Sequence, residues 1–257
     1  MAVGIIGDIH GCYEQAIELT ERLINEHGAD RIVLLGDLLD KGPAEKCAQT
    51  VSYFRNLSNS LQVDLVLSNH EEKHSRFRKR LEVKDGSINN YKNWQEMLEI
   101  TQQLSPLDVE WLEKAALYHR VPEYNIVCVH AGISPSIKRL PTFQEMQDMS
   151  SRERKHYYQM LRVRHVNKNG YMVGLGDESP EDPYWAEVYD GRFGRCVFGH
   201  QPFMQTEPKY YDHAVGIDLG CVFGGKLCSI VFKEDAEYVL TVDGHKWCEP
   251  HSYMEKR

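Results

Sequence analysis

Short apolar runs alternate with amphipathic stretches along the first third of the chain. The runs at 3–6, 31–35 and 63–67 have the length and branched composition that are typical of buried strands. The stretches at 12–26 and 44–57 repeat apolar residues at helical spacing, and Gly28 follows the first as a stop signal. This β-α-β-α-β order predicts a parallel sheet with crossover helices.

The remaining pattern predicts more helices and then a second set of strands. We expect helices at 71–82, 91–103 and 108–118, and a strand at 125–129. Short strands at 196–198, 214–217, 227–232 and 238–242 are separated by glycine turns and predict a second sheet, mixed or antiparallel. We therefore expect a single domain over 1–257, with helical insertions near 71–120 and 135–190.

Composition changes this picture only a little. The chain has 257 residues, of which 42% are hydrophobic, enough for one sizeable core. A net charge of −8 argues against a general nucleic-acid-binding surface. The seven cysteines contain no C-x-x-C pair, which favours reduced thiols and a cytoplasmic protein. No apolar run reaches the roughly 20 residues needed to cross a membrane, and no signal peptide is expected. The oligomeric state stays open.

Five short motifs end in residues that can hold a metal, and four of them directly follow a strand-like run. Each has an ordinary explanation when taken alone: His130 could be a core histidine, and Asn69 a turn residue. Five such motifs in one chain are improbable as coincidence. They are Gly-Asp8-Ile-His10-Gly, Gly-Asp37-Leu-Leu-Asp40-Lys41-Gly, Ser-Asn69-His70-Glu71, Val-His130-Ala-Gly and Phe-Gly-His200.

The residue types suit the hydrolysis of a phosphate ester. Two divalent ions held about 3.5–4 Å apart acidify a water and clamp the phosphoryl oxygens during in-line attack. Carboxylate and amide oxygens favour manganese or magnesium, whereas imidazoles favour iron or zinc. We expect two divalent ions, manganese first, with iron, zinc or magnesium as alternatives.

The ordered set of motifs resembles the calcineurin-like metallophosphoesterases, and more narrowly their phosphoprotein phosphatase branch. That branch includes Ser/Thr protein phosphatases and symmetrical diadenosine tetraphosphatases. The resemblance runs from residue 4 to about residue 225. It implies an α/β fold, a β-sandwich of mixed sheets flanked by helices.

The resemblance also implies a role for each matching residue. His70 matches the general acid, and Asp40 matches the carboxylate that orients it and should raise its pKa. The residues that match metal ligands are Asp8, His10, Asp37, Asn69, His130 and His200, with Asp37 as the bridging carboxylate.

Phosphate contacts are expected from Lys41 and from Arg162 or Arg164, with Arg162 slightly preferred. The second motif of the family usually ends Asp-Arg-Gly, whereas here it reads Asp40-Lys41-Gly42, so a point charge replaces a bidentate fork. The Lys-Gly-Pro ending resembles a subset of diadenosine-tetraphosphatase-like enzymes. Glu71, which follows His70, instead resembles protein phosphatases, so these two clues conflict.

The sequence therefore predicts a binuclear-metal phosphoester hydrolase. The leading expectation is a phosphomonoesterase of Ser/Thr protein phosphatase type, acting on a phosphorylated protein. The alternative is a symmetrical dinucleoside polyphosphate hydrolase, with a nucleotide substrate. A metal-binding regulatory protein without turnover is the third possibility, against which the intact Asp40 and His70 argue.

Overall fold

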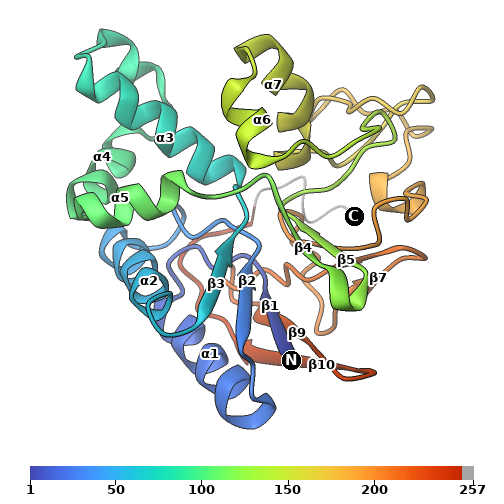
Figure 1. The fold of residues 1–257 in the computed structure, drawn as a ribbon. Helices are drawn as coiled ribbons and strands as arrows, with labels where there is room; N and C mark the ends of the chain where they lie inside the picture. Colours follow the sequence, from blue (N-terminus) through green and yellow to red (C-terminus); the bar gives the residue numbers. More distant parts are fainter. Residues whose placement is uncertain (251–257) are drawn as a thin grey trace.

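The computed structural model describes residues 1–250 and contains two five-stranded sheets. The first has the order β10-β9-β1-β2-β3 (Figure 1). Strands β1, β2 and β3 run parallel, and β9 and β10 form an antiparallel hairpin that joins the free edge of β1. The bounds are β1 Ala2–Ile6, β2 Arg31–Leu34, β3 Gln62–Leu65, β9 Lys226–Lys233 and β10 Ala236–Asp243.

The second sheet has the order β4-β5-β6-β8-β7. Its three central strands are parallel, and an antiparallel strand lies at each edge. The bounds are β4 Tyr118–Val121, β5 Ile126–Val129, β6 Arg195–Phe198, β7 Lys209–Tyr210 and β8 Ala214–Gly216.

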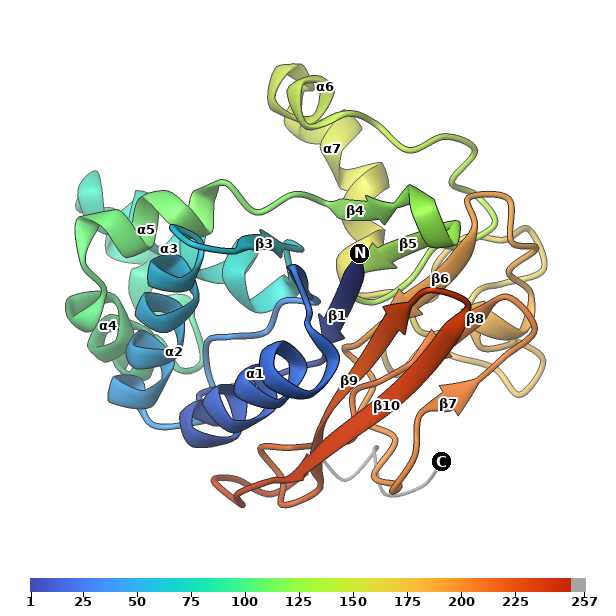
Figure 2. The same ribbon diagram turned by 60° about the horizontal axis from the view of Figure 1, so that its bottom comes forward.

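Helices lie outside the sheets. Figure 2 shows α1 beside β1 and β9, with α2 to α5 gathered farther out on that side, while α6 and α7 lie over β4 and β5. The bounds are α1 Tyr13–His27, α2 Ala44–Leu57, α3 Asn69–Glu82, α4 Trp94–Gln103, α5 Pro106–Glu113, α6 Phe143–Asp148 and α7 Ser151–Tyr157. Short 3₁₀ turns cover Gly86–Asn90, Pro122–Tyr124, Tyr158–Leu161 and Trp185–Glu187.

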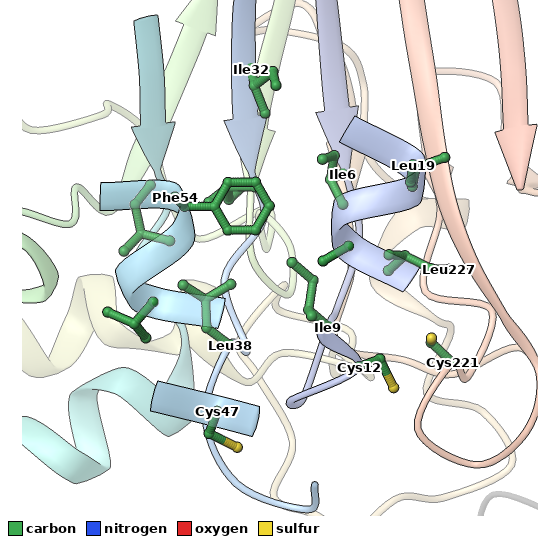
Figure 3. Close-up of a cluster of buried hydrophobic side chains, with 14 of the residues drawn as sticks. Ile6, Ile9, Cys12, Leu19, Ile32, Leu38, Cys47, Phe54, Cys221 and Leu227 are labelled. Carbon is green, nitrogen blue, oxygen red and sulfur yellow. The ribbon is translucent and has the colours of Figure 1, made fainter. Parts of the chain in front are cut away.

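The core follows the alternation of side chains along the strands. Val3 and Ile5 of β1 and Ile126 and Cys128 of β5 belong to one buried cluster, which lies between the two sheets. Ile6 and other residues on the opposite face of the first sheet pack with α1 and α2 in a second cluster (Figure 3). Strand β5 turns its other residues toward a third cluster that includes Trp185. The central strands of both sheets, such as β1 and β5, are therefore buried on both faces.

The predicted fold class is confirmed, with two corrections to the elements. The helix expected at 108–118 ends at Glu113, and strand β4, Tyr118–Val121, begins within the insertion near 71–120 that was expected to be helical. This strand forms because it pairs with β5, a partner that is read only from the tertiary structure.

The second correction concerns the last third of the chain. The strands predicted there do not form one sheet: β6 and β8 join β5, whereas β9 and β10 join β1. The pairing of β1 with β9 extends from Ala2–Lys233 to Ile6–Ser229, and it brings apolar residues of both strands onto the same faces.

Two further features bear on the expectations from composition. Within residues 1–250, no helix is both long and apolar enough to cross a membrane. All seven cysteines are free thiols; six are buried and Cys248 is partly buried. The division of the chain into domains stays a prediction.

Candidate metal centre and catalytic site

The ends of five strands bring the predicted residues together. In the first sheet Ile6 pairs with Leu34, so the loops that carry Asp8 and Asp37 leave parallel strands at the same level. In the second sheet Val129 pairs with Phe198, which places His130 beside the loop that carries His200. The carboxyl ends of parallel strands are where sites gather in α/β folds.

Local packing turns the polar side chains away from the core. Ile9 lies between Asp8 and His10, and Leu38 follows Asp37; both point into the cluster beneath the first sheet (Figure 3). Each apolar anchor fixes a loop whose neighbouring side chains then face the site. The backbone at Gly199 passes so close to Asp8 that only glycine fits there. A Cβ at this position would lie 2.0 Å from an oxygen of Asp8.

The backbone of the site is unusual. Left-handed φ angles are uncommon for residues other than glycine, and they cluster at functional sites. The residues concerned are His10 (φ 48°), Asp37 (φ 52°), Asp40 (φ 65°), Lys41 (φ 66°) and His200 (φ 67°).

Asp37 stands at the centre of two groups that could each hold a metal ion. The first group is Asp37 with His10 and His70, and the second is Asp37 with His130 and His200; within each, the ligand atoms lie within 4.8 Å of one another. His10 Nε2 lies 3.1 Å from one oxygen of Asp37, and His130 Nε2 lies 3.5 Å from the other. This is the arrangement that a bridging carboxylate requires.

The remaining predicted ligands border these groups. Asn69 Oδ1 lies 2.8 Å from His130 Nε2, whose ring is also 3.1 Å from His200 Nδ1. Asp8 accepts the backbone N–H of His200, with a distance of 2.9 Å to Oδ2. The other ring nitrogens of His10 and His130 lie 2.8 Å from the carbonyl oxygens of Leu39 and Leu35 respectively, which orients Nε2 toward the site.

The chemistry of the donor set fits metal ions. Asp37 Oδ1 and His200 Nε2 are buried without a hydrogen-bond partner among the described residues. Burial raises the pKa of Asp8 well above its usual value, and the carboxylates of Asp218 and Asp37 raise it further. Burial also lowers the pKa of His130 to about 4. Crowded carboxylates beside neutral imidazoles are stabilised by divalent cations.

His70 and Asp40 form the expected pair. His70 Nδ1 lies 2.6 Å from Asp40 Oδ2, and His70 Nε2 points toward Asp37 at 3.9 Å. Asp40 raises the pKa of His70, as expected, but the net direction is the opposite. Burial lowers that pKa and outweighs the opposing effects of Asp37 and Asp40.

A pocket of about 490 Å³ opens over the site, and Lys41, Arg162 and Arg164 all line it. Lys41 Nζ lies 2.8 Å from His10 Nε2 and 5.2 Å from the ring centre of Phe223. Arg162 donates to Glu72 at 2.7 Å, and Arg164 donates to Gln201 at 2.7 Å. Because both arginines reach the pocket, the preference for Arg162 stays a prediction.

The contacts of Glu71 could not be predicted from the sequence. The carboxylate of Glu71 is buried and accepts the backbone N–H groups of Asp37 (2.9 Å), Leu38 (3.0 Å) and Leu39 (3.2 Å). It therefore holds the loop that carries the central carboxylate. Burial raises the pKa of Glu71 to about 7.

Asp40 has two partners besides His70 that could not be predicted from the sequence. His74 Nε2 lies 2.7 Å from Asp40 Oδ1, and Lys73 Nζ lies 3.2 Å from Oδ2. Both belong to a basic stretch of α3 that resembles an ordinary solvated helix face in the sequence. No local pattern distinguishes them.

Asp218 completes the acidic side of the site. It is buried two residues after β8, and it is one of the carboxylates that raise the pKa of Asp8. The sequence Val-Gly-Ile-Asp218-Leu-Gly repeats the pattern of a short strand followed by Asp and Gly. The rule that identified Asp8 and Asp37 would have found it too.

The site has the features that a metal-dependent phosphoesterase requires: two carboxylate-and-imidazole groups that share Asp37, an oriented histidine and three cations at one pocket. The calcineurin-like phosphoesterase family model matches residues 1–204, and the chain belongs to that family. It is a hydrolase that acts on phosphoric ester bonds, so the expected family and enzyme class are confirmed.

Curated relatives refine this class. The chain is 30% identical to the asymmetrical bis(5'-nucleosyl)-tetraphosphatase PrpE of Halalkalibacterium halodurans, over 91% of each chain. It is 29% identical to the protein of the same name from Bacillus velezensis, over 98% of each chain.

Solved structures agree on the fold. The crystal structure of a candidate diadenosine tetraphosphatase superposes with a TM-score of 0.69 at 25% identity, covering 95% of this chain and 94% of that one. A Ser/Thr phosphatase from Saccharomyces cerevisiae superposes with a TM-score of 0.55 at 13% identity, covering 96% of this chain and 81% of that one. The second likeness concerns the fold alone.

Proposed function

We propose that this protein hydrolyses dinucleoside tetraphosphates asymmetrically, giving a nucleoside monophosphate and a nucleoside triphosphate. The observation that carries the proposal is the similarity to tetraphosphatases of that name across nine-tenths or more of both chains. This reverses the order of the two enzyme functions expected from the sequence, and it replaces symmetrical with asymmetrical cleavage.

Asp8, His10, Asp37, Asn69, His130 and His200 would hold two divalent ions, for which we propose manganese first. The ions would supply a water acidified for attack and a positive charge on the phosphoryl oxygens. The shared position of Asp37 supports its role as the bridging ligand, since one oxygen faces each group.

The three cations of the pocket suit a chain of phosphates better than a single one. Lys41 lies next to His10, whereas Arg164 bonds the side chain of Gln201 and lies near the backbone carbonyl of His200. Arg162 lines the same pocket from the side of Glu72. A tetraphosphate carries negative charge on four successive phosphate groups, so separated cations can neutralise more than one of them.

His70 is the proposed general acid. Asp40 holds Nδ1, which leaves Nε2 directed at the pocket to give its proton to the leaving oxygen. Burial disfavours the charged imidazole, whereas a bound polyphosphate favours it through its negative charge. A bound substrate therefore helps to keep His70 protonated, and the leaving group needs that proton.

Product analysis tests the proposal. Diadenosine tetraphosphate is incubated with the manganese-loaded protein, and the nucleotides are separated by anion exchange. We expect AMP and ATP in equal amounts. Two ADP per substrate would replace the proposal with symmetrical cleavage. Faster release of phosphate from a phosphoserine peptide than cleavage of the dinucleotide would restore the phosphoprotein hypothesis.

A further inference from the structure

The pocket is lined by apolar residues as well as by residues of the metal-holding groups. We call the apolar lining residues Met172, Val173, Gly174, Leu175 and Phe223 the apolar wall. Met172 is 38% exposed and Leu175 is 57% exposed. Large apolar side chains that gather beside a polar site mark a place where a ligand binds.

The wall is fixed relative to the arginines by a hairpin-like segment. Val173 donates its N–H to the carbonyl of His165 at 2.9 Å, and Met172 bridges to Val166. Asn167 donates its N–H to the carbonyl of Tyr171 at 2.9 Å. The stretch that carries Arg162 and Arg164 therefore continues directly into the apolar wall.

The wall also reaches close to the metal-holding groups. Phe223 lies beneath the ammonium group of Lys41, with 5.2 Å between the nitrogen and the ring centre. The same nitrogen is 2.8 Å from His10 Nε2. Lys41 therefore lies next to both Phe223 and the first metal-holding group.

We infer that this wall binds the nucleoside that lies one phosphate away from the centre, an inference that rests on the proposed function. The base offers the flat apolar surface that Met172, Leu175 and Phe223 would cover. Arg162 and Arg164 then face the rest of the phosphate chain. The pocket volume of about 490 Å³ suits one nucleoside with its phosphate better than a whole dinucleotide.

This arrangement decides which phosphorus is attacked. The nucleoside at the wall presents its own α-phosphorus to the centre. The oxygen of water forms a bond to that phosphorus, and the bond from the α-phosphorus to the oxygen that bridges to the next phosphate breaks. The bridging oxygen leaves with the nucleoside triphosphate and takes the proton from His70. The water oxygen therefore ends in the monophosphate.

Heavy-oxygen water tests the assignment of the attacked phosphorus. Diadenosine tetraphosphate is hydrolysed in water enriched in oxygen-18, and both products are weighed by mass spectrometry. We expect the label in AMP and none in ATP. Label in ATP would overturn the inference, since the attacked phosphorus would then be separated from the nearer nucleoside by a further phosphate.

Two variants test the wall itself. Leu175→Ser and Met172→Ser should each raise KM for diadenosine tetraphosphate about tenfold, because each loses apolar contact with the nucleoside. Tyr171→Ser is the matched control: Tyr171 is 56% exposed in the same hairpin-like segment and lies outside the residues that line the pocket.

The outcomes separate this inference from the proposed function. If the wall variants keep the KM of Tyr171→Ser while all three proteins cleave diadenosine tetraphosphate, the inference is overturned and the proposed function stands. If the wild-type protein leaves diadenosine tetraphosphate intact, the proposed function is overturned, and the inference with it.

Discussion

At the scale of single residues, the site is built from side chains that share partners. Asp37 faces three imidazoles, and Asp40 bonds His70, His74 and Lys73. Burial opposes ionisation of both carboxyl groups, but the neighbouring imidazoles hold their pKa values well below the usual range. Two carboxylates that stay charged in a buried place are suited to bind cations and to orient an acid.

His70 gives the first prediction. His70→Asn should lower kcat on diadenosine tetraphosphate by about 10²–10⁴-fold, since the leaving oxygen loses its proton donor. The loss should be smaller on an aryl phosphate, whose leaving group needs little protonation. Steady-state kinetics on both substrates measure the difference. Equal losses would argue against the role of acid.

Lys41 gives the second. Lys41→Ala should lower kcat by about 10²-fold, because the developing charge loses a donor, whereas Lys41→Arg should keep most of the activity. Lys46→Ala is the control: Lys46 lies over the ring of Tyr13 at 5.3 Å, much as Lys41 lies over Phe223, but outside the pocket. If Lys41→Ala and Lys46→Ala behave alike, Lys41 is only a turn residue.

At the scale of elements, strand ends and the start of α3 position the site. Ser68 caps that helix, because its side chain accepts the N–H groups of His70 and Glu71. Ser68 also donates to the carboxylate of Glu71. The helix start is thereby tied to the loop after β2, and the two elements place Asn69, His70 and Asp37 as one unit.

This tie gives the third prediction. Glu71→Gln should lower the free energy of unfolding by about 2 kcal/mol, because the amide nitrogen cannot accept the backbone N–H groups that one oxygen of Glu71 accepts, and a buried donor loses its partner. Glu72→Gln is the matched control on the same turn; its partners Arg76 and Arg162 are partly exposed, so the loss should be about 0–1 kcal/mol. Urea unfolding at pH 8 measures both. Equal losses would contradict the special role of Glu71.

Some of the helices and strands could be predicted from the sequence, and others could not. The strands that precede Asp8, Asp37 and His130 were predictable, because an apolar run followed by a polar residue is a local pattern. Strand β4 and the placement of β9 beside β1 were not, since their formation depends on partners far along the chain. The same holds for Glu71, whose acceptor role depends on N–H groups more than 30 positions away.

At the scale of the whole molecule, two sheets from different parts of the chain meet at one site. The first sheet supplies Asp8 and Asp37, and the second supplies His130 and His200. The bond from the N–H of His200 to Asp8 joins residues 192 positions apart. The proposed mechanism therefore requires two ions around Asp37 at this junction.

Anomalous scattering from crystals loaded with manganese tests that claim most directly. We expect two peaks on either side of the Asp37 carboxylate, about 3.5–4 Å apart. One peak should lie near His10 and the other near His130 and His200. Asp37→Asn crystals treated in the same way should lose at least one peak. A wild-type map with no peak at Asp37, from protein that still hydrolyses its substrate, would contradict the account.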